Sequence, residues 1–153
     1  MWFVNKAFFV VLDEAIGEAP GALDLHFHFA PGDARIDTAT KSAKTLFEDA
    51  NVLVWAGPEA PVTIEEEQGW FAWKYGQRTE RPAFRLRHES PAPAAYLTLV
   101  VPYRGAKTPE VAAQVPAGHV VGTNRVELTA TVGGQTWRFG RDLSDGTAWC
   151  TKD

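Results

Sequence analysis

The chain has 153 residues, of which 45% are hydrophobic and 22% are charged, and its formal net charge at pH 7 is −4. This length fits a single domain over residues 1–153, and these proportions exclude a disordered or fibrous chain. The acidic balance argues against nucleic acid or an anionic membrane as partner, since both attract clustered Lys and Arg. With Cys150 as the one cysteine, the chain forms no intrachain disulfide, so the redox compartment stays open.

The N-terminal region carries no recognisable targeting signal. The apolar run Ala7–Leu12 follows Lys6 but ends at Asp13, which makes it shorter than the core of a secretory signal peptide. No stretch approaches the ~20 apolar residues that span a membrane, so we expect no membrane insertion. The sequence therefore leaves the localisation undetermined.

Alternation with a period of two residues dominates the hydrophobic pattern. In Ala22–Phe29, leucines and phenylalanines alternate with Asp24, His26 and His28, as in a half-buried strand. The same pattern predicts strands at Phe84–Glu89, Ala95–Val101 and Val126–Val132. Continuous apolar runs at Phe8–Leu12 and Val52–Trp55 predict strands buried on both faces.

Turn signals separate these runs at short intervals. Gly133-Gly134 lies between Val126–Val132 and Gln135–Arg141, which predicts a β-hairpin. Helix is scarce, because only Thr40–Leu46 and Thr108–Gln114 have the composition for a helical turn or two. Many short strands with frequent turns predict an all-β fold, an antiparallel β-sandwich with little helix.

The sequence His26-Phe27-His28 is a candidate for half of a metal site. Residues i and i+2 of a strand share a face, so both imidazoles project from one side while the phenylalanines point into the core. A zinc ion needs one or two further ligands. Two solvent-facing histidines are the alternative interpretation.

Several residues are available to complete such a site. His88 lies on another alternating strand, and Asp49 comes just before Val52–Trp55. The sequence also offers Asp33, Asp37 and Glu48, and spacing alone does not choose among them. A cupin-like metal barrel also uses His-x-His, but it places a Glu about four residues later, where this chain has Gly32 and then Asp33.

The segment from Gln68 to Gly76 is rich in aromatic residues. In an extended chain Trp73 and Tyr75 share one face, and Trp70 and Lys74 share the other. One face can enter the core, which leaves aromatic rings exposed on the other as a contact surface. Sugar rings stack on such surfaces, and nearby Lys and Arg pair with carboxylates or sulfates. The triple Glu65-Glu66-Glu67 just before it is expected to form a solvated acidic turn.

The order of these segments resembles the C-terminal β-sandwich domain of the heparinase II/III-like polysaccharide lyases. The resemblance runs through FFVVLDEAIG, LDLHFHFAPG and ANVLVWA, and is most specific in the Gly-Trp-Phe…Tyr-Gly segment. It covers about residues 3–105 and weakens afterwards. In that family an (α/α) toroid domain precedes the sandwich, and this chain has no long amphipathic helix that would form one.

The resemblance implies a function and a set of site residues. The lyases cleave acidic polysaccharides by β-elimination at a uronic acid, and the sandwich forms one wall of the substrate cleft and holds a structural zinc. By resemblance, His26 and Tyr75 are cleft residues with a catalytic role. Trp70, Trp73 and Lys74, in the aromatic segment described above, are expected to bind substrate. The resemblance further implies that His28, Asp49 and His88 are the zinc ligands.

Because the toroid and its acid–base residues are missing, the chain is expected to be inactive alone. The alternative is a non-catalytic carbohydrate-binding β-sandwich that presents the same aromatic residues to sugars.

Overall fold

The computed structural model describes residues 1–57 and 61–153, and within them the chain forms thirteen β-strands and no helix. The all-β prediction is therefore confirmed. The strands are β1 (Trp2–Val4), β2 (Phe8–Ala15), β3 (Leu23–His28), β4 (Ala34–Asp37), β5 (Ser42–Thr45), β6 (Ala50–Ala56), β7 (Val62–Lys74), β8 (Gln77–His88), β9 (Ala94–Arg104), β10 (Val111–Gln114), β11 (Arg125–Val132), β12 (Gln135–Asp142) and β13 (Thr147–Lys152).

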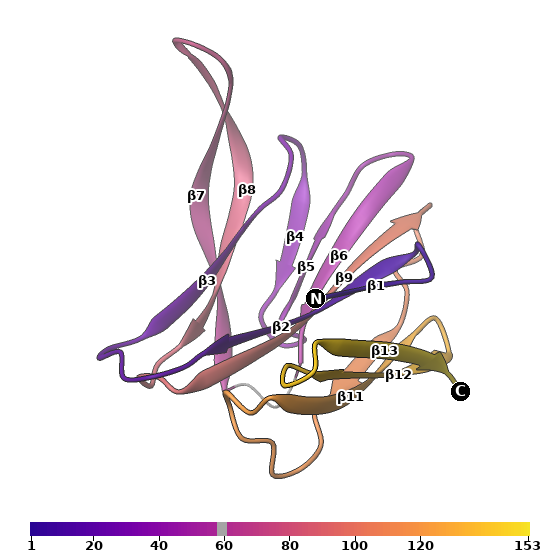
Figure 1. Ribbon diagram of the computed structural model, residues 1–153. Helices are drawn as coiled ribbons and strands as arrows, with labels where there is room; N and C mark the ends of the chain where they lie inside the picture. Colours follow the sequence, from indigo (N-terminus) through magenta and orange to yellow (C-terminus); the bar gives the residue numbers. More distant parts are fainter. Residues whose placement is uncertain (58–60) are drawn as a thin grey trace.

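These strands form three antiparallel sheets (Figure 1). The central sheet has six strands in the order β1-β2-β9-β6-β5-β4. The C-terminal sheet has the order β10-β11-β12-β13, and the third, which we call the hairpin sheet, has the order β3-β8-β7. The hairpin predicted at Gly133-Gly134 is present, with both glycines at positive φ between β11 and β12.

Two separate hydrophobic cores make this a three-layered sandwich. One core joins the central sheet to the C-terminal sheet, with Phe8 and Leu99 packing against Leu128, Trp137 and Phe139. The other core joins the opposite face of the central sheet to the hairpin sheet, with Val54 and Tyr96 packing against Ile64, Phe84 and Leu86. The central strand β6 is accordingly buried on both faces, as its continuous apolar run predicted.

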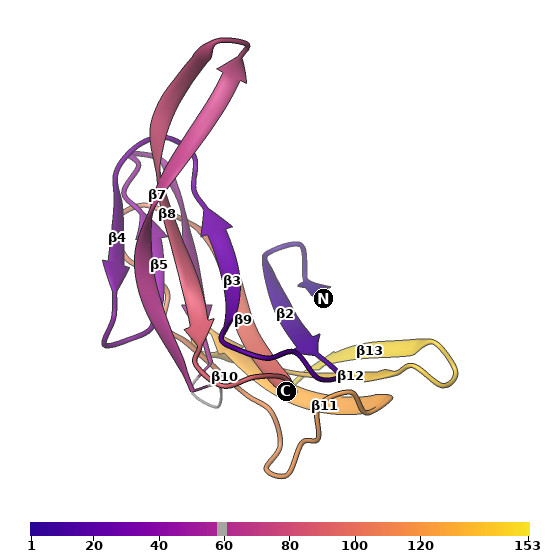
Figure 2. The ribbon, with the colours of Figure 1, turned by 90° about the vertical axis from the view of Figure 1, so that its left-hand side faces the viewer.

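The long hairpin formed by β7 and β8 extends beyond the rest of the molecule (Figures 1 and 2). The half of the hairpin where β7 begins and β8 ends, near Val62 and His88, packs on the central sheet. The half nearer the turn contributes no residue to either core. Gly69 pairs with Arg81, and a Cβ added at Gly69 would lie only 2.7 Å from the backbone oxygen of Arg81. Glycine therefore permits the close approach of the two strands where the hairpin leaves the body.

The structure corrects three local predictions. Glu65-Glu66-Glu67 lies inside β7, because each residue pairs with β8 in an unbroken ladder that starts at Val62. The two segments expected to hold helical turns, Thr40–Leu46 and Thr108–Gln114, instead contain β5 and β10. Both are short strands that pair with a longer neighbour, so tertiary pairing outweighs their weak local helical preference.

No helix of sufficient length and apolarity to cross a bilayer occurs in the described part of the chain.

Candidate functional site

The two histidines of β3 lie on the solvent-facing side of the hairpin sheet, as the alternation predicted. Leu23, Leu25 and Phe27 are half-buried toward the core, and His26 and His28 are exposed between and beyond them. Nδ1 of His26 lies 2.7 Å from Oε2 of Glu67, which is on β7 at the far side of the sheet. A contact therefore crosses all three strands of this face.

A network of ion pairs surrounds that contact. Nη2 of Arg85 donates to Oε2 of Glu65 at 2.6 Å, and Nη1 lies 3.5 Å from Glu67 and 3.6 Å from Asp24. The hydrogen bond from Arg85 lowers the pKa of Glu65, and the same bond raises the pKa of Arg85. These side chains remain in contact with water, so each pair contributes little to stability. Three carboxylates thus surround the single guanidinium of Arg85.

The structure does not bring the predicted zinc ligands together. In the β3–β8 ladder His28 is opposite Ala83 and His88 is opposite Leu23. This separation of five residues amounts to about 17 Å along the strands. His88 also shares the core-facing side with Leu23, whereas His28 is exposed on the opposite side.

Asp49 is exposed in the turn before β6, a strand of the central sheet. Zinc requires its ligands within about 2.3 Å of one point, so His28, Asp49 and His88 do not fit the ion. Among the residues that the structure describes, no group of three His, Cys, Asp or Glu side chains is arranged to hold a metal. Zinc binding therefore stays a prediction from the sequence.

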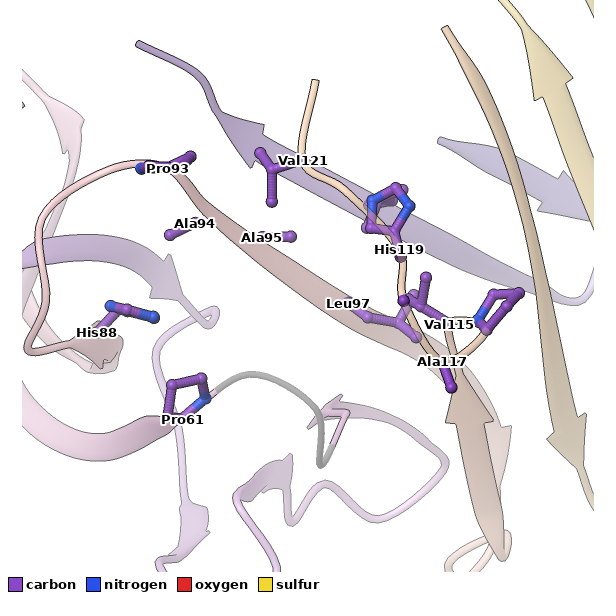
Figure 3. A pocket seen from close by; sticks show the side chains of 13 residues that line it. Pro61, His88, Pro93, Ala94, Ala95, Leu97, Val115, Ala117, His119 and Val121 are labelled. Atoms are coloured by element: carbon purple, nitrogen blue, oxygen red, sulfur yellow. The ribbon is translucent and has the colours of Figure 1, made fainter. Parts of the chain in front are cut away.

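His88 instead lines an apolar cavity of about 330 Å³ beside the start of β9 (Figure 3). Leu97 of β9, Pro61 just before β7 and His119 in the 115–121 loop line different sides of the cavity. Nδ1 of His88 is 3.1 Å from the backbone oxygen of Ser90, and its ring meets Tyr96 edge-on at 6.4 Å. His88 is thus a buried histidine with a structural partner.

The residues predicted to bind substrate gather at the end of the β7–β8 hairpin. Tyr75 and Gly76 form a two-residue turn, in which Gly76 has a φ of 75°. A positive φ at the second central residue of a turn favours glycine there. We call the tip aromatic because it carries Trp70, Trp73 and Tyr75, with relative exposures of 40%, 61% and 101%. Residues 72–78 line a shallow hollow of about 670 Å³ there.

Two cations accompany these rings. The guanidinium of Arg78 lies 4.0 Å from the centre of the Trp70 ring, which holds Arg78 in a cation–π contact. Lys74 pairs with Gln77 across the turn. Neither Lys74 nor Arg78 forms an ion pair with a carboxylate within residues 1–57 and 61–153. The aromatic tip therefore presents flat rings beside positive charge.

His26 and Tyr75, the two residues expected to be catalytic, lie far apart. His26 is opposite Arg85 in the ladder, and the tip begins at Gln77. Eight residues of extended β8 separate these positions, or about 27 Å. The two side chains therefore cannot act together on one bond within this chain.

A partly buried ionic cluster surrounds Glu14 and was not predicted from the sequence. One carboxylate oxygen of Glu14 lies 3.0 Å from Nε2 of His119 and accepts the backbone N–H of Gly122 at 3.1 Å. The other oxygen accepts a short hydrogen bond from Arg141. The cluster ties β2 and β12 to the loop that closes the apolar cavity. The partners of Glu14 lie more than 100 residues away in the sequence. No local sequence pattern indicates which charged residues form such a distant pair.

Comparison with known proteins places these features in context. No protein-family model matches the chain. A heparin-sulfate lyase from Pedobacter heparinus is 32% identical over 139 residues, which are 87% of this chain and 21% of that protein. A heparin-sulfate lyase from Bacteroides stercoris is 26% identical over 140 residues, or 88% of this chain and 21% of the relative. These matches extend beyond the expected range of residues 3–105.

Solved structures agree with the sequence matches. A crystal structure of heparinase III aligns with a TM-score of 0.85 and 27% identity, covering 92% of this chain and 22% of that one. The heparan sulfate lyase HepC from Pedobacter heparinus aligns with a TM-score of 0.83 and 26% identity, covering 92% and 23%. The chain spans about a fifth of the length of the lyases that it matches. In sequence and fold the chain therefore matches a C-terminal part of heparinase III-like lyases.

Proposed function

We propose that this chain is a module of a lyase that cleaves acidic polysaccharides, and that its aromatic tip forms one wall of the glycan-binding cleft. The observation that carries the proposal is the projecting hairpin, in a chain similar to heparin-sulfate lyases. Its end has four exposed aromatic rings and two cations that have no carboxylate partner among the described residues. Exposed aromatic clusters of this kind usually serve as contact surfaces.

The chemistry of the tip matches that of an acidic glycan. The apolar faces of sugar rings pack on Trp73 and Tyr75, which are too exposed to contribute to the core. Lys74 and Arg78 supply charge-assisted hydrogen bonds to carboxylate or sulfate groups. Arg78 is already oriented by Trp70, so less side-chain freedom is lost when an anion binds.

The chain alone is proposed to be catalytically incompetent. β-Elimination at a uronic acid requires that the carboxylate be neutralised, that one group remove a proton and that another protonate the leaving oxygen. The large separation of His26 and Tyr75 supports an acid–base pair supplied by another part of a longer lyase. Because the predicted ligands do not fit zinc, the proposal includes no metal centre.

Glycan affinity tests the proposal directly. The chain is titrated with a heparin oligosaccharide, and with a neutral maltooligosaccharide as the control ligand. Trp73→Ala and Lys74→Ala each remove about 1 kcal/mol of contact energy, so each should weaken heparin binding about fivefold. Trp149→Ala is the matched control, because Trp149 is an exposed tryptophan in the C-terminal sheet. Equal affinity of the wild type and both tip variants contradicts the proposal.

A non-catalytic carbohydrate-binding β-sandwich is the second candidate, since the same aromatic tip supports it. The two are separated by turnover: the chain is grafted into the Pedobacter heparinus lyase in place of the matching segment. The lyase-module proposal expects that Trp73→Ala lowers kcat/KM of this chimera. Unchanged kcat/KM together with weakened glycan binding favours the second candidate.

A further inference from the structure

Phe3, which is exposed, and Phe9 and Val11, which are half-buried, form an apolar strip on the central sheet. No other layer of residues 1–57 and 61–153 covers this strip. The three residues lie on the side of the sheet that faces the hairpin sheet, since Phe9 is opposite Val100 and Val11 is opposite Thr98 in the β2–β9 ladder. Phe3 is 57% exposed, and its ring stacks on Phe9 at 4.5 Å. Neither hydrophobic core includes any of the three residues.

The strip is uncovered because the two facing sheets differ in width. The central sheet has six strands and the hairpin sheet has three, and β7 lies over β4 at one end. At the other end, the hydroxyl of Tyr96 on β9 donates to the backbone oxygen of Leu23 on β3 at 2.7 Å. β3 therefore lies above β9, and β2 and β1 continue beyond it with no strand of the described residues above them (Figure 2).

The outer edge of β3 is unpaired in the described part of the chain. β3 is the last strand of the hairpin sheet and pairs only with β8. The N–H of Phe29 donates to the oxygen of Pro82 on the β8 side. Because alternate residues of an antiparallel strand point their amides to opposite sides, those of Leu25 and Phe27 also face β8. The amides of Asp24, His26 and His28 then point to the open edge.

The open edge and the uncovered strip lie next to each other, and one added strand would satisfy both. A strand paired with β3 would lie about 4.8 Å beyond it, directly above β2, at the spacing of neighbouring strands. Its inward side chains would cover Phe9 and Val11, and its outward side chains would continue the polar face of His26 and Asp24. Long exposed edges beside apolar surface otherwise promote aggregation, so they are normally covered.

We infer that this edge receives an extended strand from another part of the longer lyase polypeptide, by β-strand addition to β3. The inference rests on the proposed function in one respect, that the chain works as a module of a longer lyase. The length of the relatives supports this occupant, because about four fifths of each lies outside the matched segment. The strand is expected to alternate apolar and polar residues, with the apolar ones facing Phe3, Phe9 and Val11.

Hydrogen exchange tests the inference at named amides. Exchange is compared between the isolated chain and the chain grafted into the Pedobacter heparinus lyase. In the isolated chain the amides of Asp24, His26 and His28 should exchange about 100-fold faster than those of Leu25 and Phe27. In the chimera this difference should disappear. An unchanged difference in a folded chimera overturns the inference, and does so even when the aromatic tip binds heparin normally.

A second measurement covers the case in which the chimera does not fold. The chain is co-expressed with the tagged remainder of the same lyase, and co-purification is measured. Phe9→Asp should abolish co-purification, while Leu143→Asp, at a residue 59% exposed in the turn between β12 and β13, should not. The inference is overturned if co-purification persists in both variants, or if it is lost in both. A stable homodimer of the isolated chain that Phe9→Asp dissociates identifies a second copy as the occupant and equally overturns it.

Discussion

Replacing Phe84 by alanine should destabilise the packing of the β7–β8 hairpin on the central sheet and lower the free energy of unfolding. Phe84 is fully buried on β8, the middle strand of the hairpin sheet, and its ring contacts Phe27 at 5.2 Å and Phe29 at 5.5 Å between centroids. Strands on both sides hold β8 in place, so the site cannot collapse around a cavity. We therefore expect the loss to approach the upper part of the range of about 3–5 kcal/mol for a buried phenylalanine.

Urea and thermal unfolding measure this loss. For a domain of this size each kcal/mol lowers Tm by about 2–4 °C, so the expected decrease is about 8–20 °C. Trp73→Ala serves as the control, since Trp73 is 61% exposed and should change Tm by less than about 2 °C. Because the core with the C-terminal sheet is separate, amides of β11 and β12 should keep more of their protection than those of β3 and β7. A loss below about 1 kcal/mol would refute the inference that this cluster supports the hairpin.

Three further predictions concern charged groups. Glu14→Gln should destabilise the chain by about 3 kcal/mol and speed proteolysis of the 115–124 loop, because Arg141 and His119 lose their carboxylate; unchanged cleavage contradicts this role. Arg85 lowers the pKa of Glu65, so its stabilisation is present above the ordinary pKa of 4.5 and is lost as pH falls through the lowered value. In Arg85→Gln, the pKa of Glu65, measured by NMR titration, should rise back toward 4.5. An unchanged pKa of Glu65 in this variant refutes the pairing. His28→Ala and His88→Ala should each leave the zinc content of the dialysed chain unchanged, as measured by atomic emission; a parallel loss in both variants contradicts the separation of the two residues.

The period-two alternation determined most of the strands and their faces, because the side-chain direction of a strand follows from sequence position alone. It placed Phe27 inward and His26 outward correctly, and it identified the all-β class. It also contained a sign against the predicted zinc site. His88 has the same parity as Phe84 and Leu86, which are apolar, whereas His28 has the parity of the polar positions.

Tertiary structure alone decided which strands are neighbours and how far along them two residues lie. The ladder register separates His28 from His88 and His26 from Tyr75, and no local pattern encodes that register. The same holds for β5 and β10, whose pairing with longer strands overrides their composition. The difference in width between the central sheet and the hairpin sheet also arises only on assembly, since it depends on how many strands each layer recruits. Side-chain direction is a property of the local backbone, whereas strand pairing and layer width are set by contacts between segments distant in the chain.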